Sequence, residues 1–284
     1  MWLCLALGLG LLCVGGAPAR AVQLSPCQGN FEAVRGPSYR FALDPAGVPV
    51  PAVLAEELEL GAQAIYDNWR SLLSAEPPFV VEINLRLLSD RAAFAALKSQ
   101  LAPDLPDVTG FYAWEGNLAV ALYESGNPTQ SRRRALHEVS HVVTAAQTGA
   151  APHWLAEGLA EFHEMVHSDS GGLVVSANGR HLRLLHAHSP PDLGVFLGLP
   201  AEAWHREDSQ RLYAIAWSLV YFLMGSSEGR GALGQTLQQS TTHSCQAYSA
   251  ASFLDRAWPG GLPDLQRQWH GWLARGEFAA IRLP

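Results

Sequence analysis

Two apolar segments with helical spacing, 134–146 and 153–166, are separated by a short break from Gly149 to Pro152. Glycine and proline interrupt helices, because glycine adopts backbone conformations closed to other residues and proline lacks the N–H that a helix interior needs. A break of this length lets the second helix fold back beside the first. The sequence therefore predicts a helical hairpin in which polar side chains of both segments can meet.

The first segment, RALHEVSHVVTAA, holds two histidines four residues apart, His137 and His141, with Glu138 directly after the first. On a helix, residues four apart lie one turn apart on the same face, so two imidazoles can reach a single ion. Zinc lowers the pKa of a bound water, and a neighbouring carboxylate can accept its proton as the water attacks a carbonyl. The HExxH spacing thus predicts a catalytic zinc site with Glu138 as general base.

A catalytic zinc ion generally has a third protein ligand. The pattern HExxHxxGxxH is excluded, because Thr144 and Gln147 occupy its glycine and third-histidine positions. The second segment, HWLAEGLAEFHEMV, offers Glu157 instead, 16 residues after His141.

HEVSH followed by PHWLAEGLAEF resembles the gluzincin metallopeptidases, the thermolysin-related clan in which a glutamate ligand follows HExxH on the next helix. The resemblance covers residues 134–162 closely. It implies zinc held by His137, His141 and Glu157. It also implies a zincin-like α+β fold with an edge strand beside the active-site helix. The pattern along the chain predicts a mixed α/β N-terminal lobe (22–128) and a mainly helical lobe carrying the zinc site (129–284).

The resemblance suggests further roles, each with a competing one. Glu161 would orient a ligand histidine, but it could itself be the ligand or lie on the surface. Tyr213 would donate a hydrogen bond to the developing oxyanion, although a core tyrosine on an apolar helix is an equal alternative; His205 and Tyr112 remain open for that role. The strand NLAVALY (117–123) would pair with an extended peptide substrate, or be only structural.

Periodicity places the remaining elements. Helical spacing is found in 52–73, 91–101 (with Ser89-Asp90 as cap), 153–166, 209–224, 244–258 and 262–276. Strands are expected in 79–88 and, as a hairpin, in 110–114 and 117–123, and GLVVS (172–176) could be a short strand. The rest of 168–200 fits no class.

The other histidines are expected to do less. His163 and His167 repeat the four-residue spacing without an adjacent acid, so a second metal site is an alternative to packing. His153 could face the cleft, pack against neighbouring residues or lie on the surface. A larger set in the unclassified stretch could line a substrate site or lie in a solvated loop: His181, His186 and His188.

The N-terminus and the overall charge bear on location and partners. Residues 1–21 are apolar and end in small residues, which predicts a signal peptide cleaved after Ala21; an uncleaved anchor is the alternative. We therefore expect a secreted or periplasmic protein without stable membrane insertion, in which Cys27 and Cys245 could form a disulfide. The net charge of -7 gives no reason to expect a nucleic-acid partner.

These features together predict an exported zinc metallopeptidase that acts on a peptide or protein substrate. The alternatives are a zinc amidase acting on a cell-wall peptide bond, and a secreted binding protein in which zinc only braces two helices. Glu138 speaks against the last alternative, because a structural site needs ligands but no base.

Overall fold

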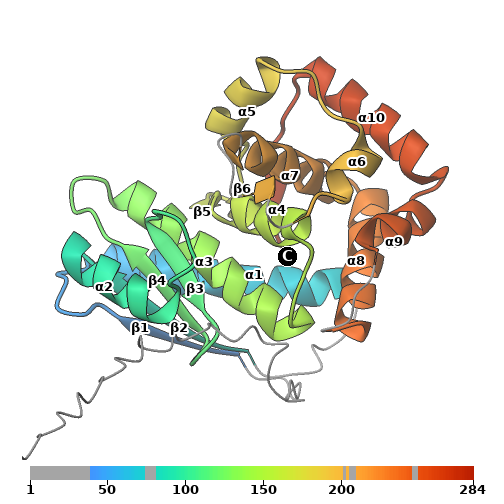
Figure 1. Ribbon diagram of the computed structural model, residues 1–284. Helices are drawn as coiled ribbons and strands as arrows, with labels where there is room; N and C mark the ends of the chain where they lie inside the picture. The colour runs from blue at the N-terminus through green and yellow to red at the C-terminus, as the bar shows by residue number, and fades with distance from the viewer. Residues whose placement is uncertain (1–38, 74–80, 201–202, 205–208, 245–248) are drawn as a thin grey trace, which may run out of the picture.

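The computed structural model describes residues 39–73, 81–200, 203–204, 209–244 and 249–284. The expected signal peptide, Cys27, Cys245 and His205 lie outside these ranges. Within them, none of the helices combines the length and the apolar character that crossing a membrane requires. Strands and helices mix in the first half and helices dominate the second, so the α+β class is confirmed (Figure 1).

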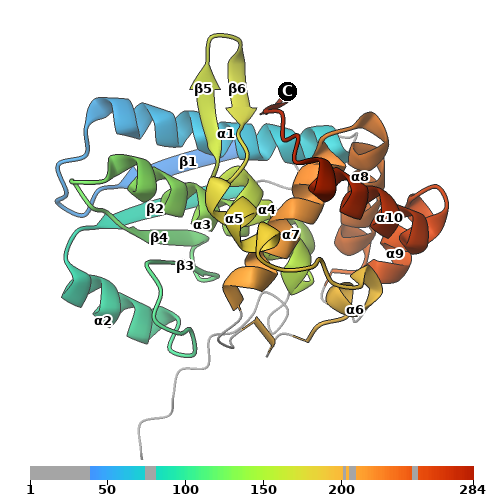
Figure 2. The ribbon, with the colours of Figure 1, turned by 90° about the horizontal axis from the view of Figure 1, so that it is seen from above.

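A four-stranded sheet lies in the N-terminal part of the molecule (Figure 2). Its strands have the order β1 (Tyr39–Asp44), β2 (Val81–Leu88), β4 (Leu118–Leu122) and β3 (Gly110–Ala113). The first three run parallel, and β3 pairs antiparallel with β4. This confirms the hairpin predicted over 110–123 and the strand predicted to end at Leu88.

The expectation that segment 117–123 is an edge strand was wrong. β4 pairs with β2 along one side and with β3 along the other. The tight hairpin lays β3 on the outer side of β4, and the crossover from β2 places β2 on its inner side. β3 therefore lies at the end of the sheet, and its outer side has no strand partner in the described part of the chain.

Helices cover both faces of the sheet because its side chains alternate. Ile83, Leu85 and Leu87 of β2 belong to the main core, which they share with α1 (Ala52–Leu73) and α3 (Pro128–Thr148). On the other face, alternate residues of β3 and β4 form a small cluster with α2 (Arg91–Leu101). Asp90 caps α2 as predicted, because its side chain accepts hydrogen bonds from the N–H groups of Ala92 and Ala93.

The second half of the chain adds helices and a small sheet. The helices are α4 (His153–His163), α5 (Gly179–His186), α6 (Leu193–Leu197), α7 (Ser209–Met224), α8 (Ser227–Thr242), α9 (Ala250–Ala257) and α10 (Gly261–Arg275). The strands β5 (Val166–Asp169), β6 (Gly172–Val175) and β7 (Ile281–Arg282) form an antiparallel sheet. Figure 2 shows the β5–β6 hairpin extending beyond α1. The main core includes residues from both halves of the chain.

Several elements differ from the sequence-based expectation. α4 ends at His163 rather than residue 166, because the chain turns into β5. α8 was not predicted, since its glycines and hydroxyl residues disfavour a helix locally. Tertiary packing outweighs that preference: a Cβ atom at Gly234 would lie 2.2 Å from the carbonyl oxygen of Leu72, so α8 approaches the end of α1 closely.

Candidate metal centre

The two helices of the predicted hairpin form as the sequence indicates. α3 begins after Asn127, whose side-chain oxygen accepts a hydrogen bond from the N–H of Gln130 at 3.2 Å. It ends at Gly149, where φ is 68°, a left-handed value that suits glycine. α4 starts at His153 and packs against α3. The faces carrying the expected ligands therefore meet.

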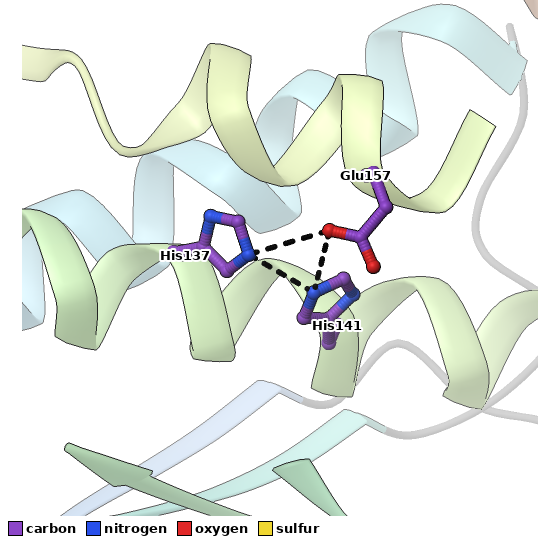
Figure 3. A group of neighbouring side chains, drawn as sticks. All are labelled: His137, His141 and Glu157. Atoms are coloured by element: carbon purple, nitrogen blue, oxygen red, sulfur yellow. Dashed lines mark hydrogen bonds and ion pairs between the residues drawn. The ribbon is translucent and has the colours of Figure 1, made fainter. Parts of the chain in front are cut away.

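Three candidate ligand atoms converge between α3 and α4 (Figure 3). Nε2 of His137 lies 3.2 Å from Nε2 of His141, and Oε2 of Glu157 lies 3.5 Å and 3.6 Å from these two nitrogens. A tetrahedral zinc ion with bonds of about 2.0–2.1 Å separates its ligand atoms by about 3.3–3.4 Å. The donor types and their spacing therefore fit zinc, and three ligands leave one position open.

Glu138 of α3 lies beside this group, next to the first residue of β3. Its side chain is buried, with 8% exposure, and burial raises the pKa of its carboxyl group. Gly110 gives the carboxylate its space: a Cβ atom there would lie 2.5 Å from Oε1 of Glu138. The candidate general base is thus held against the edge strand, next to the candidate ligands.

The charges around the group favour a cation. Burial raises the pKa of Glu157, but His141 and His137 lower it more, so its carboxylate stays ionised. Burial lowers the pKa of His137, but Glu157, Glu164 and other carboxylates outweigh this and raise it well above the usual value. The carboxylates of Glu138, Glu157, Glu161 and Glu164 outnumber the two candidate ligand imidazoles around this group.

Two carboxylates, one in the last turn of α4 and one on the residue that caps it, face the other nitrogen of His137. Oε1 of Glu161, the predicted orienting residue, lies 4.0 Å from Nδ1, and Oε2 of Glu164 lies 3.7 Å from it. Both distances are longer than a hydrogen bond. Sequence reasoning missed Glu164, although its helical spacing of seven from Glu157 and three from Glu161 puts all three on one face.

Tyr213 lies near the group, in the first part of α7. Burial raises its pKa, and the charges of Glu157, Glu161 and Glu138 raise it further, so the hydroxyl is within range of these carboxylates. Its ring also contacts Trp204 edge-to-face, with centroids 5.7 Å apart. The ring contact is the packing that one expectation gave Tyr213, and its role as a hydrogen-bond donor stays a prediction.

The other candidate residues have different surroundings. The ring of His153 packs against that of Trp204, with centroids 6.0 Å apart, as expected for a packing role. The hydroxyl of Tyr112 on β3 is buried without a hydrogen-bond partner, and burial raises its pKa. His186 and His188 are exposed, whereas His181 is buried.

His163 and His167 do not form a second metal site. His163 is fully buried, and its ring nitrogens contact Ser140 Oγ at 2.8 Å and Asn68 Nδ2 at 3.0 Å. His167 lies on β5, beyond the end of α4, so the spacing of four is not helical. Instead, His163 connects α1, α3 and α4.

Comparison with known proteins assigns no family. No protein-family model matches the chain, and no curated protein matches it. The likeness to gluzincins therefore rests on the residues of α3 and α4 and on the geometry that these helices give them.

Proposed function

We propose that the protein is a zinc-dependent hydrolase that cleaves peptide bonds in a peptide or protein substrate. One observation carries the proposal: Nε2 of His137, Nε2 of His141 and Oε2 of Glu157 form a triangle with sides of 3.2–3.6 Å. Glu138 lies beside this triangle on α3, the helix that also carries His137 and His141. Three protein ligands without cysteine, together with a buried acid, are typical of catalytic rather than structural zinc.

The residues divide the chemistry as follows. His137, His141 and Glu157 would hold the zinc, which would supply Lewis-acid chemistry at this position. Glu138 accepts a proton from the attacking water as the water oxygen bonds to the carbonyl carbon. It then returns the proton to the leaving nitrogen as the C–N bond breaks. One water is consumed, and the products are a carboxylic acid and an amine.

The surroundings indicate how a substrate would lie. β3 is at the end of the sheet, and its first residue, Gly110, contacts Glu138. An extended peptide pairing with the outer side of β3 would bring its backbone close to the base. Tyr213 would donate a hydrogen bond to the carbonyl oxygen as negative charge develops there. Neither a nucleic acid nor a membrane is part of this proposal.

The test combines zinc content with hydrolysis of a mixed peptide library by the purified protein. We expect about one zinc per chain in the wild type and cleavage of library peptides. Glu138→Gln should keep zinc and lose at least about 100-fold in kcat/KM, because it keeps the shape but cannot accept the proton. Glu157→Ala should lose zinc, and the exposed Glu56→Gln should change neither quantity.

Two results would contradict the proposal. A wild-type protein that takes up no zinc after reconstitution has no metal centre. Full activity in Glu138→Gln would remove the general base. If zinc binds but no library peptide is cut, a panel of cell-wall peptides tests the amidase alternative, and no hydrolysis there either would refute catalysis.

Export belongs to the same proposal. Residues 1–21 would direct secretion or passage to the periplasm, and the mature chain would begin at Val22. N-terminal sequencing of the secreted protein checks this directly. A chain that keeps Met1 at the membrane would contradict it.

A further inference from the structure

The two carboxylates behind His137 are each connected to α5. Glu161 lies in the last turn of α4 and Glu164 is the residue that caps the end of this helix, and their side chains are 13% and 15% exposed. Each directs one oxygen toward Nδ1 of His137, at 4.0 Å for Oε1 of Glu161 and 3.7 Å for Oε2 of Glu164. Their other oxygens point to the start of α5.

Oε2 of Glu161 and Oε1 of Glu164 each have a hydrogen-bond donor at the start of α5. Nε2 of His181 contacts Oε2 of Glu161 at 2.6 Å, and Nδ2 of Asn178 donates to Oε1 of Glu164 at 3.0 Å. Each carboxylate therefore connects α5 to the same imidazole through two different oxygens. Asn178 also caps α5, since its side-chain oxygen accepts from the backbone N–H groups of Arg180 and His181.

The start of α5 is itself fixed. The His181 side chain is 4% exposed, and its ring packs against Trp217 of α7 with centroids 5.4 Å apart. Trp217 is fully buried. The donor on His181 is thus held by the core, away from the solvent screening that weakens surface pairs.

Zinc binding by His137 would explain why two carboxylates lie behind its ring. A histidine that binds zinc through Nε2 carries its proton on Nδ1, and a carboxylate accepting that N–H fixes the tautomer and makes the ligand more basic. A carboxylate performs this role well only if its own position is fixed. His181 and Asn178 supply that restraint, one for each carboxylate.

We propose that His181 and Asn178 are positioning residues for the zinc ligand His137, acting through Glu161 and Glu164. The inference rests on the proposed function, since it assigns these residues to the same metal centre. It extends the centre to α5, a helix that the sequence pattern left unclassified.

A different use of the same atoms would be a second ion held by Nδ1 of His137 and the two carboxylates. That use would require His137 to give up both ring protons. It would also compete with the donors that already hold one oxygen of each carboxylate. Two zinc ions per wild-type chain would support this second site and would overturn the positioning role of His181 and Asn178.

The experiment measures zinc affinity by competition with a chromophoric chelator, independently of hydrolysis. We expect His181→Ala to bind zinc about tenfold more weakly, or worse, because the loss of an outer partner typically costs 10- to 100-fold. Asn178→Asp keeps the cap oxygen but loses the donor and repels Glu164, so it should also weaken binding. His181→Gln should restore most of the affinity through its amide N–H, and the exposed His186→Ala should bind as the wild type does.

The cobalt(II)-substituted proteins supply a second measurement, since their visible spectra depend on ligand geometry. We expect altered bands in His181→Ala and the wild-type spectrum in His181→Gln and His186→Ala. Wild-type zinc affinity and spectra in both His181→Ala and Asn178→Asp would overturn this inference while leaving the hydrolase proposal intact. A wild-type protein without zinc would overturn both.

Discussion

Gly110 is the residue at which the sheet meets the candidate base. A Cβ atom there would lie 2.5 Å from Oε1 and 2.9 Å from Cγ of Glu138. No zinc ligand is among these closest atoms. A methyl group at this position would therefore press first on the side chain of the base.

We expect Gly110→Ala to retain zinc and to lower kcat by about 10- to 100-fold, because a shift of about 1 Å in a catalytic group has an effect of that size. Zinc content and peptide cleavage measure the two effects separately. Gly126→Ala is the matched control, since a Cβ atom there meets nothing within 4 Å. Unchanged kcat in Gly110→Ala would mean that the position of Glu138 is not critical.

His163 makes folding sensitive to acid. Burial lowers the pKa of its imidazole to about 3, against about 6.5 in an unfolded chain. Between these values the unfolded chain binds a proton that the folded chain does not. Stability is therefore complete above about pH 6.5 and falls as the pH decreases from 6.5 toward 3.

For this one group we expect a loss of about 2 kcal/mol in the free energy of unfolding between pH 7.5 and pH 5. Urea unfolding of the zinc-free protein at both values measures it, with His163→Gln as the test variant. The variant should show a pH dependence smaller by that amount, whereas the exposed His186→Gln should keep the wild-type dependence. Equal pH dependence in His163→Gln and the wild type would show that His163 does not titrate as its burial implies.

At the scale of elements, α4 depends on a close approach to α7. A Cβ atom at Gly158 would lie 2.8 Å from the carbonyl oxygen of Ala216 and 2.8 Å from Cγ2 of Val220. The neighbouring residue is the candidate ligand Glu157. The helix interface and the metal centre are therefore coupled through adjacent positions.

Gly158→Ala should push α4 away from α7, destabilise the fold by about 1–3 kcal/mol and weaken zinc binding. Urea unfolding and zinc competition measure the two effects. Gly231→Ala in α8, where a Cβ atom meets nothing within 4 Å, should be neutral or stabilising, because alanine favours a helix more than glycine does. A Gly158→Ala protein as stable as the wild type would contradict the close packing.

Helices and strands could be predicted where the spacing of apolar residues within the segment itself indicates them. The apolar spacing of 52–73 and 209–224 gave α1 and α7 with the observed bounds. The order of strands carries no such local signal, so the edge position of β4 was expected from the resemblance alone and was wrong. β7 has two residues and forms only against β6, so no pattern of its own exists.

In the candidate site, too, residues could be predicted where a local pattern marks them and not where tertiary contacts alone place them. His137, His141 and Glu157 were predictable because helix geometry and a short connection bring them together. Glu164 was recognisable by spacing but had no motif to draw attention to it. His181 and Asn178 were not predictable, since their contacts depend on how the chain returns from the β5–β6 hairpin.

At the scale of the whole molecule, the expected lobes share one core. The cluster includes Trp69 of α1, Leu155 of α4, Leu237 of α8 and Trp269 of α10. α1, from the first half of the chain, packs against both α3 and α8. The main core therefore forms only when both halves are folded, whereas the small cluster under α2 belongs to the first half alone.

We therefore expect the zinc-free protein to unfold in a single transition. Far-UV circular dichroism and tryptophan fluorescence should give coincident urea curves, and the calorimetric and van't Hoff enthalpies should agree within about 10%. Two separate transitions would indicate lobes that are stable independently.

The hairpin of α3 and α4 also has a consequence for the order of folding. The outermost ligands are 157 − 137 = 20 residues apart, whereas the contact of Leu72 with Gly234 spans 234 − 72 = 162 residues. The entropic cost of closing the shorter loop is smaller by about 2 kcal/mol. The metal-binding hairpin can therefore close while α1 and α8 are still apart, and a chain emerging during synthesis has all three ligands before α8 has been made.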